Sequence, residues 1–374
     1  MVLFGVALLV AAMVITAECQ VHFPSSDPEP DNRISNDCTA SNGQKGTCYE
    51  FRSTNFKECS FFPSLDSTNP DVKSHLELNL CRNTGREAYF CCPSATSTTP
   101  AEEITAATRT GIFPSEKECG MSQRFNVVGG ESTAAGDWPW LAAILGNVFP
   151  SRERSVFCGA TLITKQHVIS AAHCFKKRFP NTIVRLGEYN VSIPNSLDGG
   201  QDFEIVDERI ANYDRVTKEN DLILLKLDRP VNQFTDFIRA ACLPFHLRND
   251  PFDGKTLEVV GWGLVVVETL TYTDTPLLGK VPVVPLSECQ EAYKKKSSSL
   301  VDNRQLCAGT GVTDSCRGDS GGPLNYLDFN TGRFYIVGVV SFGPKNCGDS
   351  NLPGVYGRIG SYLDWIEEKV REML

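Results

Sequence analysis

The chain has 374 residues, of which 41% are hydrophobic and 22% are charged. This length exceeds that of a typical single domain, and the apolar content can fill at least one large core, so we expect two domains. The formal net charge of -9 argues against nucleic acid as a partner.

The amino terminus is an apolar stretch, residues 2–15, too short to span a bilayer comfortably and followed at once by polar sequence. We interpret residues 1–19 as a signal peptide, with Ala17 and Cys19 at the small-residue cleavage site. Removing Cys19 from the 15 cysteines leaves an even number to be paired. The sequence therefore predicts a secreted, extracellular protein, and no later stretch predicts a transmembrane helix.

Six cysteines lie close together after this segment, at Cys38, Cys48, Cys59, Cys81, Cys91 and Cys92. A module this small buries little core, so three disulfides are expected to hold it together at residues 37–93. Spacing alone does not choose among the pairings. Residues 94–118 are rich in Ser, Thr, Ala and charge, which predicts a flexible linker.

From Asn126 onward, short apolar and β-branched runs alternate with turn residues. These runs lie at residues 140–145, 160–163, 182–186, 257–262 and 335–341. Repeated short strands of this kind predict an antiparallel barrel or sandwich. Leu363, Ile366, Val370 and Met373 recur at helical spacing, so we expect the chain to end with an amphipathic helix packed on the β domain.

Three motifs follow one another in the order histidine, aspartate, serine. They are Ala-Ala-His-Cys at 171–174, Asn-Asp at 220–221 and Gly-Asp-Ser-Gly-Gly-Pro at 318–323. A serine hydroxyl needs a neighbouring imidazole to take its proton, and the imidazole needs a carboxylate to fix its tautomer and stabilise its charged form. The three motifs can supply these groups.

Each residue alone has an ordinary explanation. His173 could be a core or surface histidine, Asp221 a strand-end cap, and Ser320 part of a glycine-rich turn. Their joint occurrence in this order favours a nucleophilic site with these three catalytic residues. The flanking glycines also let the backbone amides of Gly318 and Ser320 approach a developing oxyanion.

Residues 127–374 resemble the chymotrypsin-like serine peptidases. The matching landmarks are Val-Val-Gly-Gly at 127–130, Trp-Pro-Trp at 138–140, Ser-Ala-Ala-His-Cys at 170–174, Asp-Leu-Ile-Leu-Leu at 221–225, Gly-Trp-Gly at 261–263, the serine motif and Gly-Val-Tyr at 354–356. The resemblance implies an all-β fold, a double six-stranded antiparallel β-barrel with a C-terminal helix and the active site between the barrels. It gives His173 as general base, Asp221 as its orienter and Ser320 as nucleophile, and it leaves His167 without a role.

The six-cysteine module followed by a linker and this domain resembles the clip-domain serine proteases of arthropods, especially through Cys91-Cys92-Pro93. The two resemblances imply seven disulfides: Cys38–Cys91, Cys48–Cys81, Cys59–Cys92, Cys119–Cys242, Cys158–Cys174, Cys289–Cys307 and Cys316–Cys347. Members of the clip-domain family cut other zymogens in extracellular cascades of clotting, melanisation or Toll-type signalling. A zymogen substrate, an upstream activating protease and a serpin-type inhibitor are therefore expected as partners, and the module either docks partners or serves as a spacer.

Asp314 lies six residues before Ser320, where trypsin-like members carry the carboxylate of the primary specificity pocket. A buried carboxylate there favours substrates with Arg or Lys. Gly343 and Gly354 match the small residues that keep such a pocket open, and Ser315 does not decide between Arg and Lys. An exposed aspartate in a turn is the alternative.

The resemblance implies activation by a new amino terminus, Val127, that pairs with Asp319. The residue before the cleaved bond is Asn126, where the family usually has Arg or Lys. Cleavage after Arg124 would leave two extra residues, about 7 Å of extended chain. We hypothesise that activation requires an Asn-directed protease or trimming after a cut at Arg124.

Three minor features have competing interpretations. Glu188 matches the start of a calcium-binding loop, which Asp198 or Asp202 could close, or it belongs to a solvated acidic loop; no cofactor is otherwise required. Asn190 begins the only Asn-x-Ser/Thr sequon and predicts a glycan. The lysines at 294–296 indicate a solvated face more readily than a binding surface.

The leading hypothesis is a secreted zymogen of a trypsin-like serine endopeptidase that activates another zymogen. A catalytically silent clip-domain adaptor is the alternative, supported only by the unusual Asn126. A digestive trypsin is a third reading, but it does not need the disulfide-rich module.

Overall fold

The computed structural model describes thirteen stretches of the chain: residues 37–39, 45–50, 80–83, 88–93, 111–123, 133–148, 154–176, 179–192, 200–266, 271–296, 301–309, 318–344 and 352–374. The signal peptide predicted at 1–19 lies outside them. So does residue 126, together with the bond that is predicted to be cleaved.

The first barrel is a closed antiparallel sheet in which the strand order is β10-β7-β6-β5-β8-β9. Its strands are β5 (Leu141–Asn147), β6 (Arg154–Leu162), β7 (His167–Ser170), β8 (Ile183–Leu186), β9 (Gln201–Ile210) and β10 (Ile223–Leu227). Closure pairs every strand on both sides and leaves no exposed sheet edge.

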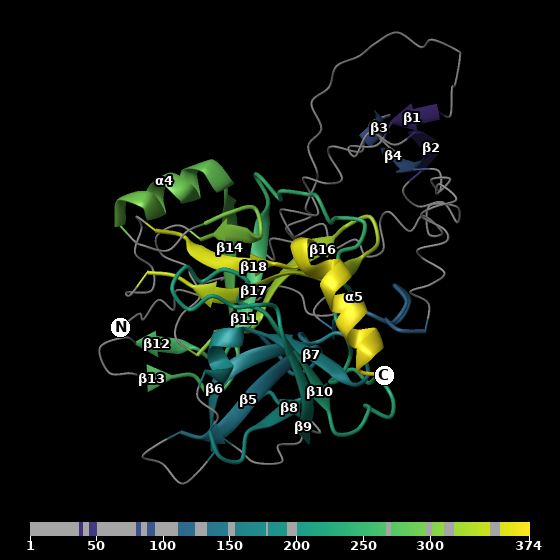
Figure 1. Cartoon of the computed structure of the whole chain (residues 1–374). Helices are drawn as coiled ribbons and strands as arrows, with labels where there is room; N and C mark the ends of the chain where they lie inside the picture. The colour runs from purple at the N-terminus through teal and green to yellow at the C-terminus, as the bar shows by residue number, and fades with distance from the viewer. Residues whose placement is uncertain are drawn as a thin grey trace, which may run out of the picture.

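The second barrel repeats this design with the order β11-β14-β15-β18-β17-β16. Its strands are β11 (Thr256–Gly261), β14 (Leu277–Val284), β15 (Gln305–Ala308), β16 (Pro323–Asp328), β17 (Arg333–Phe342) and β18 (Gly354–Arg358). The two barrels lie against each other in Figure 1, the first in teal and the second in green to yellow. The predicted double six-stranded barrel is confirmed.

One cluster of buried apolar side chains spans the junction of the two barrels. Trp140, the residue before β5, is fully buried, and its ring lies 5.5 Å from the ring of Phe334 on β17. The Trp140 indole N–H donates to Asn325 Oδ1 on β16 at 2.8 Å, which satisfies a buried donor. Tight apolar packing across the junction fixes the two barrels relative to each other.

The predicted C-terminal helix is α5 (Leu363–Glu372), preceded by the 3₁₀ helix η3 (Ile359–Tyr362). Leu363, Ile366 and Val370 are fully buried on one face, so the expected amphipathic packing is confirmed. Helix α4 (Leu286–Lys296) was not predicted. Only Cys289 and Tyr293 of its described side chains are buried, which leaves too few apolar positions for a periodic signal.

Two small sheets complete the described structure. The hairpin of β12 (Leu264–Val266) and β13 (Thr271–Tyr272) follows β11. In the cysteine-rich module, β1 (Asp37–Thr39), β2 (Lys45–Glu50), β3 (Leu80–Asn83) and β4 (Ala88–Pro93) form a sheet in the order β1-β2-β4-β3. Cys38 and Cys48 are disulfide-bonded, while the partners assigned in this module stay predictions.

Candidate active site

His173 and Asp221 come from neighbouring strand ends of the first barrel. His173 lies on the 3₁₀ helix η2 (Ala172–Phe175), just after β7, and Asp221 lies just before β10. Ser170 pairs with Ile223 in the antiparallel register of β7 and β10. The residues beyond this pair therefore meet at the same end of the barrel, far apart in sequence but adjacent in space.

The Asp221 carboxylate holds the imidazole by two contacts. Its Oδ1 accepts the backbone N–H of His173 at 2.8 Å, and its Oδ2 lies 2.7 Å from His173 Nδ1. Ser341 Oγ donates to the same Oδ2 at 2.6 Å. The Asp221 side chain is only 3% exposed, so three donors compensate a carboxylate removed from water. This arrangement places the Nδ1 proton toward Asp221 and leaves the lone pair on Nε2.

Ser320 enters the site from the second barrel, three residues before β16 begins at Pro323. Its carbonyl oxygen accepts the backbone N–H of Gly159 on β6 at 2.8 Å. Gly321 has φ of 81°, and a Cβ there would lie 2.2 Å from Ser170 Oγ. Only glycine permits this approach, so the serine segment packs directly on the strand end that leads to His173.

The position of Asp319 depends on two further glycines. Its Oδ1 accepts the backbone N–H of Gly263 at 2.8 Å. A Cβ on Gly261 or on Gly263 would lie 2.3 Å from a carboxylate oxygen of Asp319. The Gly-Trp-Gly motif therefore provides a slot for this carboxylate beside the serine segment.

The remaining predicted site residues fall into two groups. Gly318 has φ of 102°, a conformation that favours glycine, and it lies two residues before Ser320. Gly343 and Gly354 lie at adjacent strand ends, because Phe342 of β17 pairs with Val355 of β18. Asp314, Ser315, Asn126 and Val127 lie outside the described residues, so their assignments stay predictions.

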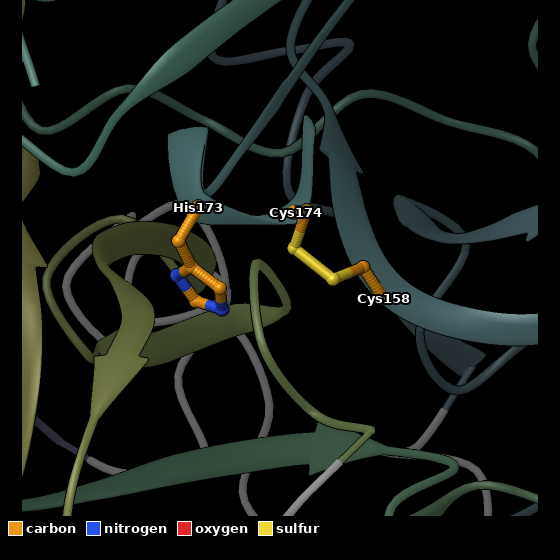
Figure 2. Close-up of side chains that lie close together, drawn as sticks. All are labelled: Cys158, His173 and Cys174. Atoms are coloured by element: carbon orange, nitrogen blue, oxygen red, sulfur yellow. A yellow bond between two sulfur atoms is a disulfide. The ribbon is translucent and has the colours of Figure 1, made fainter. Parts of the chain in front are cut away.

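A disulfide lies beside His173, as Figure 2 shows. Cys158, His173 and Cys174 bring three atoms that could bind a metal within 4.8 Å of one another. Cys158 and Cys174 are joined to each other, however, and a disulfide offers no thiolate to a metal. The pair instead ties η2 to β6, and Cys174 Sγ lies 3.8 Å from the carbonyl oxygen of Ser320.

Two more of the implied disulfides are present. Cys289–Cys307 joins α4 to β15, and Cys119–Cys242 joins the segment before the first barrel to the segment between the barrels. Residues 316 and 347, the remaining implied pair of this domain, lie outside the described part of the chain.

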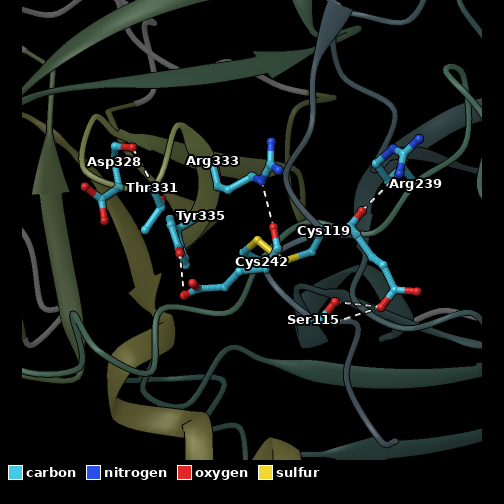
Figure 3. Close-up of a disulfide and its surroundings, with 10 residues drawn as sticks. Ser115, Cys119, Arg239, Cys242, Asp328, Thr331, Arg333 and Tyr335 are labelled. Atoms are coloured by element: carbon cyan, nitrogen blue, oxygen red, sulfur yellow. Dashed lines mark hydrogen bonds between the residues drawn. A yellow bond between two sulfur atoms is a disulfide. The ribbon is translucent and has the colours of Figure 1, made fainter. Parts of the chain in front are cut away.

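The segment 111–123 is held against the second barrel by more than this disulfide (Figure 3). Arg333 Nε donates to the carbonyl oxygen of Glu116 at 2.7 Å, and the Tyr335 hydroxyl donates to Glu116 Oε1 at 2.8 Å. The backbone N–H of Gly120 donates to Ala240 O at 2.9 Å. Residues 111–118, the last part of the predicted flexible linker, are therefore docked on the peptidase domain.

The described part of the predicted calcium loop does not fit a cation site. Asp202 accepts hydrogen bonds from Arg185 at 2.6 and 3.0 Å, and Glu188 Oε2 lies 3.6 Å from Arg185 Nη1. A guanidinium thus lies between the two carboxylates, where calcium would need oxygen ligands only. The hydrogen bonds that the guanidinium donates to Asp202 raise the pKa of Arg185, so this charge is fixed. Residue 198, the other candidate ligand, lies outside the described residues.

The other sequence features have simple surroundings. Asn190 Oδ1 accepts hydrogen bonds from Ser192 N at 3.0 Å and Ser192 Oγ at 2.7 Å, and the predicted glycan stays a prediction. Lys294 is exposed at the end of α4 and pairs with Glu291, as a solvated face would. His167 is buried, and its Nδ1 lies 2.8 Å from Thr164 Oγ1, away from the active site.

Sequence reasoning missed two groups at the site. Ser341 was predicted only as the last residue of the strand run 335–341, although its hydroxyl contacts Asp221. The half-exposed ring of Tyr272 on β13 packs beside Gly318, where an added Cβ would lie 3.1 Å from its Cε1. Neither residue carries a local motif, because Ser341 reaches the site through β17 of the second barrel and Tyr272 through the separate β12–β13 hairpin.

Comparison with known proteins identifies the family. Residues 127–366 match the family described as Trypsin. Over 309 residues the chain is 37% identical to the CLIP domain-containing serine protease HP8 of Bombyx mori, covering 76% of this chain and 80% of that protein. The chain belongs to the clip-domain serine proteases of the trypsin family.

Two further relatives extend over almost the whole protease. Phenoloxidase-activating factor 3 of Holotrichia diomphalia is 33% identical over 354 residues, covering 89% of this chain and 93% of that protein. The proclotting enzyme of Tachypleus tridentatus is 31% identical over 371 residues, covering 93% and 92%. The protease is thus a trypsin-like serine endopeptidase whose likeness to clip-domain proteins includes the amino-terminal region. No helix in the described stretches combines the length and hydropathy needed to cross a membrane.

Proposed function

We propose that this protease is a secreted zymogen that uses His173, Asp221 and Ser320 to cut a protein substrate after Arg or Lys. The observation that carries the proposal is the geometry of the Asp221 carboxylate: one oxygen accepts the backbone N–H of His173, and the other lies within hydrogen-bond distance of its Nδ1. That geometry suits the triad chemistry, in which the carboxylate orients an imidazole that serves a serine nucleophile.

In the proposed mechanism, His173 Nε2 takes the proton of Ser320 as the hydroxyl oxygen attacks the scissile carbonyl. The same nitrogen then returns the proton to the leaving amine, and the cycle repeats with water on the acyl-enzyme. Asp221 stabilises the imidazolium that forms between these steps. The amides of Gly318 and Ser320 stabilise the oxyanion.

Specificity for Arg or Lys rests on Asp314 at the base of the primary pocket, with Gly343 and Gly354 keeping its walls open. The strand ends that carry the two glycines are adjacent, which supports a common pocket. A carboxylate removed from water discriminates strongly against an uncharged side chain, because such a substrate would leave it unpaired.

Activation is proposed to follow cleavage after Asn126 and pairing of the new Val127 amino group with Asp319. The glycine slot at 261 and 263 supports this step, because it holds the Asp319 carboxylate one residue from the nucleophile. An ion pair there would order the Gly318 and Ser320 amides.

The cascade role is proposed from the relatives. One is named a phenoloxidase-activating factor and another a proclotting enzyme, and these names refer to the activation of phenoloxidase and to clotting. We infer that the substrate is itself a zymogen, that an upstream protease performs the activating cut, and that a serpin-type inhibitor ends activity in the extracellular fluid.

The test uses the purified full-length zymogen, cut separately by a trypsin-like and an Asn-specific protease. The new amino terminus is sequenced and hydrolysis of an Arg ester is measured, with a Ser320→Ala variant as the control. The proposal predicts activity only when Val127 is the first residue, and none in the control. If chains that begin at Val127 cleave no ester or peptide with Arg or Lys, the protein is a non-catalytic adaptor.

A further inference from the structure

The loop that carries Asp221 is held from the opposite barrel. Asn220, the residue before Asp221, has a left-handed φ of 54°, which asparagine tolerates better than most residues. Its side chain is bound at both ends. Nδ2 donates to Asn212 O within the loop at 3.4 Å, and Oδ1 accepts from Arg304 Nη1 at 2.9 Å and from the Tyr362 hydroxyl at 3.2 Å.

Arg304 and Tyr362 both belong to the second half of the domain. Arg304 lies directly before β15, and its carbonyl oxygen accepts the backbone N–H of Arg358 at the end of β18. Tyr362 ends η3, which follows β18. Ser320 is also carried by this half of the domain, whereas His173 and Asp221 belong to the first barrel.

The Arg304 guanidinium is itself fixed and compensated. Its Nε donates to Asp302 Oδ2 at 2.9 Å, and its Nη2 lies 3.3 Å from Glu219 Oε2 on the Asp221 loop. Two carboxylates thus balance the charge of Arg304. Its planar guanidinium contacts both the loop that carries Asp221 and Asp302 of the second half of the domain. The contact to Asn220 is therefore suited to setting position rather than to supplying charge.

We propose that Arg304 is a positioning residue for the reaction: through Asn220 it ties the peptide that leads into Asp221 to the barrel that carries Ser320. This inference rests on the proposed function of the triad. Loss of this contact removes the shorter of the two hydrogen bonds that hold Asn220 from the second half of the domain, and it lets the His173–Asp221 pair shift relative to the serine. Small misplacements of reacting groups cost rate far more than they cost binding.

The test compares Arg304→Met with Arg248→Met in the activated enzyme. Arg248 makes a two-pronged ion pair with Asp364 on α5, and its side chain is 34% exposed against 36% for Arg304, which makes it a matched control. Arg304→Met is expected to lower kcat about tenfold with KM changed less than about twofold. Arg248→Met is expected to leave both unchanged.

Two further variants separate positioning from stability. Asn220→Gly still permits the left-handed turn but removes the side-chain oxygen that accepts from Arg304, so it should lower kcat as much as Arg304→Met does. If the two residues act through one contact, kcat of the double variant should be no lower than that of either single variant. Arg304→Lys keeps the positive charge but lacks the planar guanidinium, so its kcat should be little higher than that of Arg304→Met. Equal kcat in Arg304→Met and Arg248→Met, or additive losses in the double variant, would overturn the inference.

A readout independent of activity keeps this inference distinct from the proposed function. The low-field proton resonance of the His173–Asp221 hydrogen bond is recorded in the Ser320→Ala background. Arg304→Met should shift or broaden it, and Arg248→Met should not. If the wild-type enzyme starting at Val127 is inactive, the proposed function fails, whereas an unchanged resonance in Arg304→Met removes the positioning role.

Discussion

At the scale of single residues, the carboxylate of Asp221 makes three specific contacts in the site. It accepts from the His173 backbone, faces His173 Nδ1 and accepts from Ser341. The sequence predicted the first partner because histidine and aspartate motifs occur in a recognisable order. Ser341 could not be predicted this way, since it reaches Asp221 only after β17 has paired within the second barrel.

Asp221→Asn is expected to lower kcat about 10⁴-fold with little change in KM, because the amide favours the wrong imidazole tautomer. Ser341→Ala removes one neutral donor and is expected to cost about tenfold. The measurement is steady-state hydrolysis of an Arg ester by enzyme starting at Val127. Similar losses in the two variants would mean that the carboxylate does not set the tautomer.

His167 predicts a dependence of stability on pH. Burial lowers the pKa of this imidazole to about 4, and the charge of Lys226 adds to the effect. The unfolded chain takes up a proton as pH falls through about 6.5, whereas the folded chain resists protonation until pH 4. The stability present above pH 6.5 is therefore lost progressively between pH 6.5 and pH 4.

His167→Gln retains a polar partner for Thr164 and removes the proton uptake. Between pH 7 and pH 5 the wild type should lose about 2 kcal/mol more unfolding free energy than the variant. Urea unfolding in the Ser320→Ala background, followed by tryptophan fluorescence, gives this difference. Parallel pH dependence of the two proteins would show that His167 is not neutral in the fold.

At the scale of elements, strands were easier to predict than helix α4 and the loop between β8 and β9. Runs such as residues 335–341 became β17 because β-branched residues fill a strand buried along its length. Helix α4 buries only two of its described side chains and is anchored by the Cys289–Cys307 disulfide, so tertiary context decides its conformation. Glu188 suggested calcium because the sequence could not reveal that Arg185 occupies the space between it and Asp202.

This ion cluster predicts that calcium does not stabilise the domain. Addition of EDTA should leave the thermal unfolding midpoint unchanged, whereas Arg185→Met should cost about 3 kcal/mol, because it removes one partner of the buried ion pair with Glu188. Differential scanning calorimetry of the Ser320→Ala zymogen measures both. A lower midpoint in EDTA would show that the domain binds a stabilising cation, which would contradict the prediction.

At the scale of the whole molecule, the fold divides the proposed triad between the two sides of the barrel junction. His173 and Asp221 belong to the first barrel and Ser320 to the second, and Trp140, Phe334 and the Gly159–Ser320 contact hold the junction. The sequence predicted this architecture through its resemblance to a known family. The contacts that set the alignment of the halves, such as Arg304 to Asn220, carry no motif and emerge only from the structure.

The Cys119–Cys242 disulfide predicts the fate of the amino-terminal part after activation. On a non-reducing denaturing gel, the cleaved wild type should migrate as one species, whereas a Cys119→Ser, Cys242→Ser double variant should separate into two fragments. Reduction should separate the wild type as well. Separation of the cleaved wild type without reductant would show that Cys119–Cys242 does not connect the two parts of the cleaved chain.

The most direct test of the triad is covalent labelling of the nucleophile by a fluorophosphonate, followed by peptide mapping. The protein starting at Val127 should carry one label, on Ser320, and His173→Ala should react far more slowly because its serine is no longer activated. Correctly cleaved protein that leaves Ser320 unlabelled would contradict the account, since the hydroxyl would then not be the nucleophile that the His173–Asp221 geometry requires.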